Sequence, residues 1–216
     1  MFEYSILHWS TFFAASVMLV LSPGPNVAFI LSQVLKGSKS AGFAALFGIW
    51  IGNGIHIFLA AIGLSALLAT SAILFEIVKW IGAAYLIWMG YNALRSKGGT
   101  FAQEDNTDIQ KKPAVNLTLV FKQSAIVSTL NPKTALFFLT FLPQFIVPEA
   151  GPIWAQITLH GVLLTLTGAI LDAILIIGGA KLVGKLDGNK NFALWVDRGV
   201  GAILIGLGLR LAFIER

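Results

Sequence analysis

The chain has 216 residues, of which 56% are hydrophobic and 12% are charged, with a net charge of +5 and no cysteine. The charged share is about half that of soluble domains, which excludes an ordinary soluble protein, and the missing cysteine excludes disulfides, thiolate metal sites and thiol redox chemistry. In so apolar a chain the positive charge indicates membrane orientation, and no nucleic-acid partner is expected.

Three apolar runs predict three membrane spans in the first half. No formal charge occurs over residues 4–35 or 40–75, and a further apolar run covers 72–94. Because a span needs about 20 apolar residues, each run is long enough to cross a bilayer. The first run has no basic residue before it and is too long for a signal peptide, so we expect it to remain in the mature chain.

A polar connection separates this half from a second set of three runs. Residues 95–115 contain Gly98-Gly99, an acidic cluster and Pro113, and are predicted to form a cytoplasmic loop. Further apolar runs follow at residues 116–147, 153–183 and 192–213. The fourth run is interrupted, and it can be interpreted as one long bent helix or as two short segments.

The basic residues predict the orientation of these spans. Ten of them fall in alternate connections: Lys36, Lys39, Arg95, Lys97, Lys111, Lys112, Lys122, Lys181, Lys185 and Lys190. The tail and the remaining loops carry only Arg210 and Arg216. By the positive-inside rule both termini are expected outside, which in a bacterium is the periplasm.

Short matches between the halves indicate an internal repeat. Pro25 is followed by Asn26 and then Ala28, and Pro132 is followed by Lys133 and then Ala135. A basic residue three before a Gly-Ala pair recurs as Lys79 and as Arg198. Chance matches in apolar sequence are the alternative explanation.

The predicted fold is therefore an all-α, polytopic membrane protein with one transmembrane domain over residues 1–216. Its first repeat covers residues 1–94 and its second covers 116–216. Three spans per half is an odd number, so the two halves would have opposite orientations, as in the inverted repeats of many transporters. Spans 1 and 4 are expected to be broken helices.

The breaks themselves are the strongest functional signal. Ser22-Pro23-Gly24-Pro25-Asn26 and Asn131-Pro132-Lys133 each interrupt an apolar run. Proline removes a backbone donor, so each helix must break within the membrane, and the restarted helix presents free N–H groups and a positive dipole end. Such a site suits a carboxylate. A packing kink would explain one proline, but two matched breaks favour a binding site at the midplane.

The order of these motifs resembles the LysE/RhtB family of bacterial amino-acid exporters. The motifs that carry the resemblance are Pro-Gly-Pro-Asn at residues 23–26, the residues Gly48, Gly52, Asn53, His56 and Gly63, Lys79 with Gly82-Ala83, Tyr85-Leu86 and Gly90, and Asn131-Pro132-Lys133 followed by Phe141, Pro143, Gln144 and Phe145. The resemblance implies a multi-pass exporter in the bacterial cytoplasmic membrane that moves amino acids outward with the proton gradient. Where relatives often carry an acid in the second span, this chain has Asn53, which favours neutral substrates such as threonine, homoserine or leucine.

These considerations predict one substrate site. Its expected residues are Gly24, Pro25, Asn26, Asn53, Lys79, Asn131, Pro132 and Lys133. The substrate carboxylate would rest on the two helix breaks, with Lys79 assisting. Glu76 lies three residues before Lys79, so a local ion pair that neutralises both near the outer interface is the alternative for that lysine.

Proton coupling is assigned to Asp172 and His56. Asp172 is the most isolated acid of the chain, and an acid that alternates between protonated and ionised forms can carry a proton. Alternatively, Asp172 could bind the substrate ammonium group, or it could form a fixed ion pair between helices. His56 could join a proton relay or simply bond a neighbouring helix. Less weight falls on His160, and His8 is expected to mark the interface.

Other classes of protein fit the sequence less well. No catalytic constellation, metal motif, dinucleotide fingerprint or phosphate loop is present, so an enzyme, a cofactor and an ATP drive are not expected. A channel-like or exchanger permease for another small metabolite is the alternative transporter. A channel would need a pore with a ring of selective groups, whereas this sequence offers two interrupted helices related by a repeat. A membrane assembly subunit would leave Asp172 unexplained. Because most soluble oligomers are symmetric homo-oligomers, with dimers the commonest, a homodimer is the expected oligomeric state.

Overall fold

The computed structural model describes residues 4–21, 24–36, 38–70, 72–95, 115–187 and 190–213, and the regular structure within them is helical throughout. The α-helices are α1 (Ile6–Leu21), α2 (Pro25–Lys36), α3 (Lys39–Thr70), α4 (Ala72–Arg95), α5 (Leu117–Thr129), α6 (Pro132–Phe141), α7 (Ile153–Asp187) and α8 (Lys190–Ala212). Two short 3-10 turns, η1 (Leu142–Phe145) and η2 (Pro148–Ala150), connect α6 to α7. The predicted all-α class is confirmed.

Both expected breaks separate two helices. Pro25 is the first residue of α2 and Pro132 the first of α6. The axes bend by 59° between α1 and α2 and by 53° between α5 and α6. Proline favours the first turn of a helix because its fixed φ suits that turn and its missing N–H is not needed there. The fourth apolar run is thus two short helices rather than one continuous bent helix.

Among the described residues, two helices are long and apolar enough to cross a membrane alone. They are Lys39–Ser65 of α3 and Ile153–Gly178 of α7, and each bent pair also passes as one span, which raises the number to four. In α8 the described apolar stretch, Gly201–Ala212, is shorter. The arrangement as six spans in two inverted repeats therefore stays a prediction.

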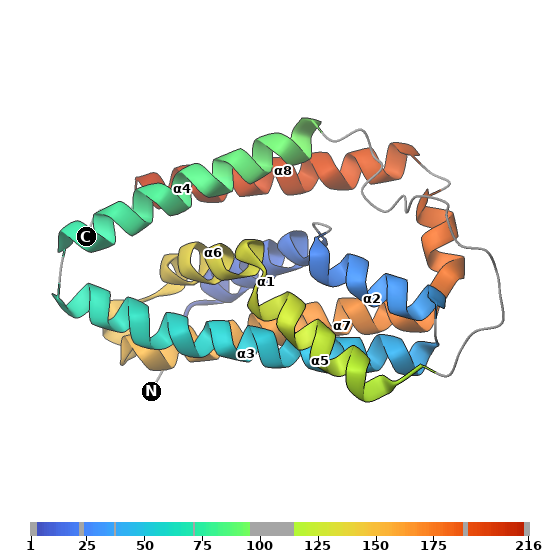
Figure 1. The fold of residues 1–216 in the computed structure, drawn as a ribbon. Coiled ribbons are helices and arrows are strands. Elements are labelled where there is room, and N and C mark those ends of the chain that lie inside the picture. The colour runs from blue at the N-terminus through green and yellow to red at the C-terminus, as the bar shows by residue number, and fades with distance from the viewer. Residues whose placement is uncertain are drawn as a thin grey trace.

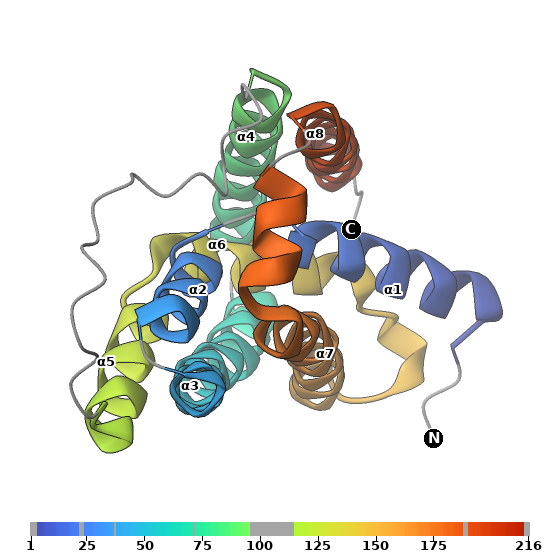
Figure 2. The same cartoon turned by 90° about the vertical axis from the view of Figure 1, so that its right-hand side faces the viewer.

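Two groups of helices are visible in Figure 1. The long helices α4 and α8 run side by side, and the remaining helices gather around α3, α6 and α7 (Figures 1 and 2). A Cβ on Gly90 would lie 2.6 Å from the carbonyl oxygen of Gly201, so these glycines allow the backbones of α4 and α8 to touch. Figure 1 places both chain ends at one end of the molecule, the terminal end.

Glycines also allow α3 and α5 to pack closely. A Cβ on Gly52 would lie 2.5 Å from the Cβ of Ser128 and 2.9 Å from the backbone nitrogen of Thr129. Gly48, one turn earlier, faces Ser124 at similarly close range. Only glycine at these positions allows α5, which leads to the second break, to lie directly on α3.

Candidate functional site

A cavity of about 130 Å³ lies where the two helix breaks meet. Its lining comes from α1, the start of α2, α3, the start of α6, and α7: Leu19, Val20, Gly24, Asn26, Val27, Ile49, Asn53, Asn131, Lys133, Thr134, Phe137, Phe138, Leu164, Thr165, Gly168 and Asp172. An engineered cavity of about 150 Å³ holds benzene, so this one has room for a small organic molecule.

Paired asparagines hold the two breaks together. The side-chain amide of Asn131 donates to Oδ1 of Asn26 at 3.1 Å, and the amide of Asn26 donates to the hydroxyl of Ser128 at 3.4 Å. Asn131 also caps α6, because its Oδ1 accepts from the backbone N–H of Lys133 at 3.0 Å. The residues that start the two helices are therefore bonded directly to each other across the halves of the chain.

Two helix N-termini converge on this cavity. Asn26 and Val27 lie in the first turn of α2, Thr134 lies in the first turn of α6, and all three line the cavity. First-turn N–H groups have no partner within their own helix, and the macrodipole adds positive potential there. Two such ends side by side favour an anionic group between them.

Two opposite charges complete the lining. Lys133 and Asp172 carry the formal charges among the described lining residues. The lysine side chain lies against Gly24, where an added Cβ would be 3.2 Å from Nζ and 3.3 Å from Cδ. Asp172 reaches the cavity from α7 and is buried. An anion site and a carboxylate in one small space match the two charges of a zwitterion.

Asn53 and His56 belong to the wall formed by α3. Asn53 lines the cavity, and its Oδ1 accepts from the Ser128 hydroxyl at 3.1 Å. His56 is buried beside the cavity, with Nε2 at 3.1 Å from the carbonyl oxygen of Ser128 and its ring stacked on Phe138. This contact with α5 is the interhelical bond that was the alternative to a proton relay, and the relay stays a prediction.

The structure separates Lys79 from the other predicted binding residues. Lys79 lies on α4, which contributes none of the described cavity lining. Its Nζ donates to Oε1 of Glu76 at 2.7 Å, so the local ion pair expected from their spacing is present. Pro25 and Pro132 are also absent from the described lining, and they act there by starting α2 and α6.

Thr165 is a lining residue that sequence reasoning missed. Its hydroxyl oxygen is buried and has no hydrogen-bond partner among the described residues. By contrast, the hydroxyls of Thr158 and Thr167 on the same helix donate to the carbonyl four residues earlier at 2.8 Å. Thr165 lies seven residues before Asp172, which puts both on one face of α7. This spacing relative to Asp172 is the sequence signal by which Thr165 could have been predicted to line the site.

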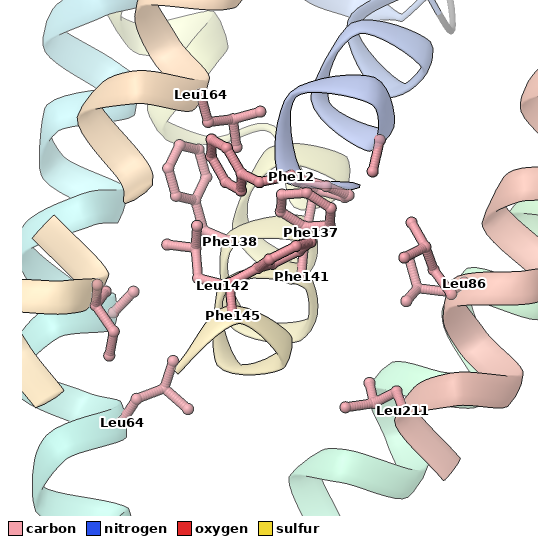
Figure 3. Close-up of a cluster of buried hydrophobic side chains, with 14 of the residues drawn as sticks. Phe12, Leu64, Leu86, Phe137, Phe138, Phe141, Leu142, Phe145, Leu164 and Leu211 are labelled. Carbon is pink, nitrogen blue, oxygen red and sulfur yellow. The ribbon is translucent and has the colours of Figure 1, made fainter. Parts of the chain in front are cut away.

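Aromatic side chains close the cavity on the side of α6. Phe137 and Phe138 line it, and they continue into a phenylalanine cluster with Phe12, Phe141 and Phe145, whose rings are almost fully buried (Figure 3). Phe141 stacks on Phe137 with ring centroids 4.7 Å apart and lies 4.8 Å from Phe145. From the second break, α6 runs toward the terminal end (Figure 1).

Comparison with known proteins identifies the family. The sequence pattern of the LysE type translocators matches residues 17–214. The chain belongs to the LysE type translocator family. This confirms the resemblance inferred from the motifs, and together with the apolar helices it indicates an integral inner-membrane protein.

Several curated proteins are similar to this LysE-type chain over nearly its full length. The leucine efflux protein of Salmonella choleraesuis is 30% identical and that of Klebsiella pneumoniae 28% identical, each over 99% of this chain and 98% of the relative. An uncharacterized membrane protein of Pseudomonas aeruginosa is 30% identical over 94% of this chain and 93% of its own. No solved structure matches the chain.

Proposed function

We propose that this LysE-type protein exports neutral aliphatic amino acids, leucine foremost, from the cytoplasm in exchange for protons. The observation that carries the proposal is that two helix N-termini, Lys133 and Asp172 converge on one cavity. Relatives of nearly equal length are named leucine efflux proteins. Both termini would lie in the periplasm, and the two halves would form inverted repeats that alternate access to the cavity.

The proposed pose follows from charge. The substrate carboxylate rests between the starts of α2 and α6, where first-turn N–H groups and the Lys133 ammonium group offer donors. The substrate ammonium group lies at the carboxylate of Asp172. The side chain then occupies the apolar part of the lining: Leu19, Val20, Val27, Ile49, Phe137, Phe138 and Leu164.

The same lining supports selection of neutral substrates. A basic amino acid brings a second cation, which would need a second buried acid. Asp172 is the one acid among the described residues of the lining, and Asn53, on the α3 wall, is uncharged. A lysine or arginine side chain would therefore lose its hydration without gaining a partner, and this penalty discriminates against it.

Exchange for protons follows from competition at Asp172. The carboxylate can hold a proton or an ammonium group, but the protonated acid no longer attracts the cation. A proton arriving from outside therefore releases the substrate, and loss of that proton inside restores the site. Because the proton and the substrate ammonium group cannot occupy the Asp172 carboxylate together, inward movement of the proton is coupled to outward movement of the substrate.

Transport by purified protein in vesicles tests this function. Vesicles loaded with radiolabelled leucine are expected to lose it faster when the outer solution is made acidic, and a protonophore should abolish the acceleration. Labelled lysine should leave at the rate of protein-free vesicles. Leucine loss equal to that of protein-free vesicles would refute export, and loss that requires external leucine and ignores the pH gradient would instead identify an exchanger.

A further inference from the structure

Two histidines form a direct hydrogen bond away from the cavity. His8 on α1 and His160 on α7 approach with their Nε2 atoms 2.8 Å apart. Nδ1 of His160 lies 2.8 Å from the carbonyl oxygen of Gln156. Neither histidine lines the cavity, and the proposed transport cycle does not use them.

These contacts determine where the protons lie. A carbonyl oxygen can only accept, so Nδ1 of His160 carries a hydrogen, and Nε2 of the neutral ring is an acceptor. Nε2 of His8 is therefore the donor. One added proton can be shared, because the donor and acceptor roles can reverse. With both rings protonated, two N–H groups and two positive charges face each other at 2.8 Å, and the contact must break.

The pair fastens the start of the chain to α7. Tyr4 stacks on the His8 ring with centroids 4.4 Å apart, and its hydroxyl donates to Oε1 of Gln156 at 3.0 Å. Trp9 stacks on the His160 ring at 5.3 Å. The amide of Gln156 also donates to the carbonyl oxygen of Val147, in the α6–α7 connection, at 2.8 Å. Loss of the histidine contact would loosen these elements together.

The same rings rest on the phenylalanine cluster. Phe12 meets the His160 ring edge-on with centroids 4.9 Å apart, and Phe145 meets the His8 ring edge-on at 5.6 Å. Because Phe137 and Phe138 of this cluster line the cavity, the histidine pair lies at the far side of its aromatic wall. Separation of α1 from α7 would therefore remove support from that wall.

Tyr4 and Arg210 are the other titratable or charged groups that face the pair within the described residues. Burial raises the pKa of the Tyr4 hydroxyl above its usual value, so Tyr4 stays neutral in the range where histidines titrate. Arg210 on α8 lies over the Phe145 ring at 5.7 Å, and its charge acts on His8. Its repulsion adds to that between two protonated imidazoles.

We propose that His8 and His160 form a second proton-binding site, a latch that holds the terminal end closed and opens when both imidazoles are protonated. Its role in transport rests on the proposed function, since an acidic outer solution would open the side on which substrate leaves. The conformational change itself does not depend on which substrate the protein carries.

Spin labelling tests the latch without a transport assay. The natural chain has no cysteine, so Ser10→Cys on α1 and Val162→Cys on α7, both exposed, can be labelled selectively. Electron paramagnetic resonance on the protein in nanodiscs should show a longer distance between the labels at about pH 5 than at about pH 8. An unchanged distance distribution would overturn the proposal.

A conservative variant separates the latch from general effects of acid. In His8→Gln the amide can still donate or accept, but it cannot be protonated, so the label distance should stay at its neutral-pH value at both pH values. The control Glu149→Gln, which removes an exposed titratable group outside the histidine pair, should keep the change. A shift in His8→Gln as large as in the parent protein, or its loss only in Glu149→Gln, would refute the assignment.

Flux measurements then connect the latch to transport. In vesicles containing His8→Gln, the rate of leucine efflux should increase less than in the parent protein when the external pH is lowered. At an external pH of about 8 the two rates should be close to each other. If no variant, including the parent, moves leucine, the proposed function fails and the spin-label result still decides the latch. If leucine moves and its dependence on external pH is unchanged in His8→Gln, the latch has no role in transport.

Discussion

Asp172→Asn should abolish proton-driven leucine efflux while leaving the protein in the membrane at its normal level. Asparagine keeps the shape of the side chain, but it can neither attract the substrate ammonium group nor release a proton. A hydrogen bond to a charged group contributes about 1.5–3 kcal/mol, so leucine binding should weaken roughly tenfold or more. Efflux from loaded vesicles with an acidic exterior, together with leucine binding in detergent, measures both effects.

An acid outside the cavity provides the matched control for this variant. Glu149 in η2 is exposed and does not line the cavity, so Glu149→Gln should transport at the parent rate. If Asp172→Asn retained efflux that responds to a pH gradient, Asp172 would be neither the proton carrier nor the ammonium ligand, and the proposed exchange mechanism would be wrong.

Gly24→Val should block binding by filling the site. A Cβ at Gly24 would lie 3.2 Å from Nζ and 3.3 Å from Cδ of Lys133, and valine adds two more carbons at that point. The lysine would have to leave the start of α2, and the cavity would lose volume. Overpacking of a tight site costs about 1–3 kcal/mol, so leucine affinity should fall by roughly 5- to 150-fold. Equilibrium binding of labelled leucine measures this change.

The control for this steric effect is a glycine in open space. Apart from its chain neighbours and the nearby backbone of its own helix, no atom of the described residues lies within 4 Å of a Cβ built on Gly54, so Gly54→Val on α3 should leave leucine affinity unchanged. Equal affinity in Gly24→Val and the parent protein would show that leucine does not occupy this cavity.

The helix breaks could be predicted because their cause is local. Proline lacks a backbone donor whatever surrounds it, so Pro25 and Pro132 define where α2 and α6 begin. That the breaks meet was predicted from the repeat, and the bond between Asn26 and Asn131 shows the meeting directly. The number of membrane crossings could not be predicted in the same way, because it depends on α4 and α8 as well as on the bent pairs.

The side chains around the cavity were only partly predictable. The position of Lys79 in its apolar run predicts how deep it lies in the membrane, but not which helix its own helix contacts. In the structure, α4 packs with α8 and contributes none of the described cavity lining. Thr165 was missed because threonines in apolar helices usually bond their own backbone, as Thr158 and Thr167 do. The contact between His8 and His160 joins residues that lie 152 positions apart, so no local pattern could predict it.

A crystal structure of the protein with leucine is the most direct test of whether the two helix starts form the substrate site. We expect the leucine carboxylate between Asn26 and Thr134, beside Lys133, and its ammonium group at Asp172. Ordered leucine bound elsewhere, with this cavity empty or filled by repacked side chains, would contradict the account.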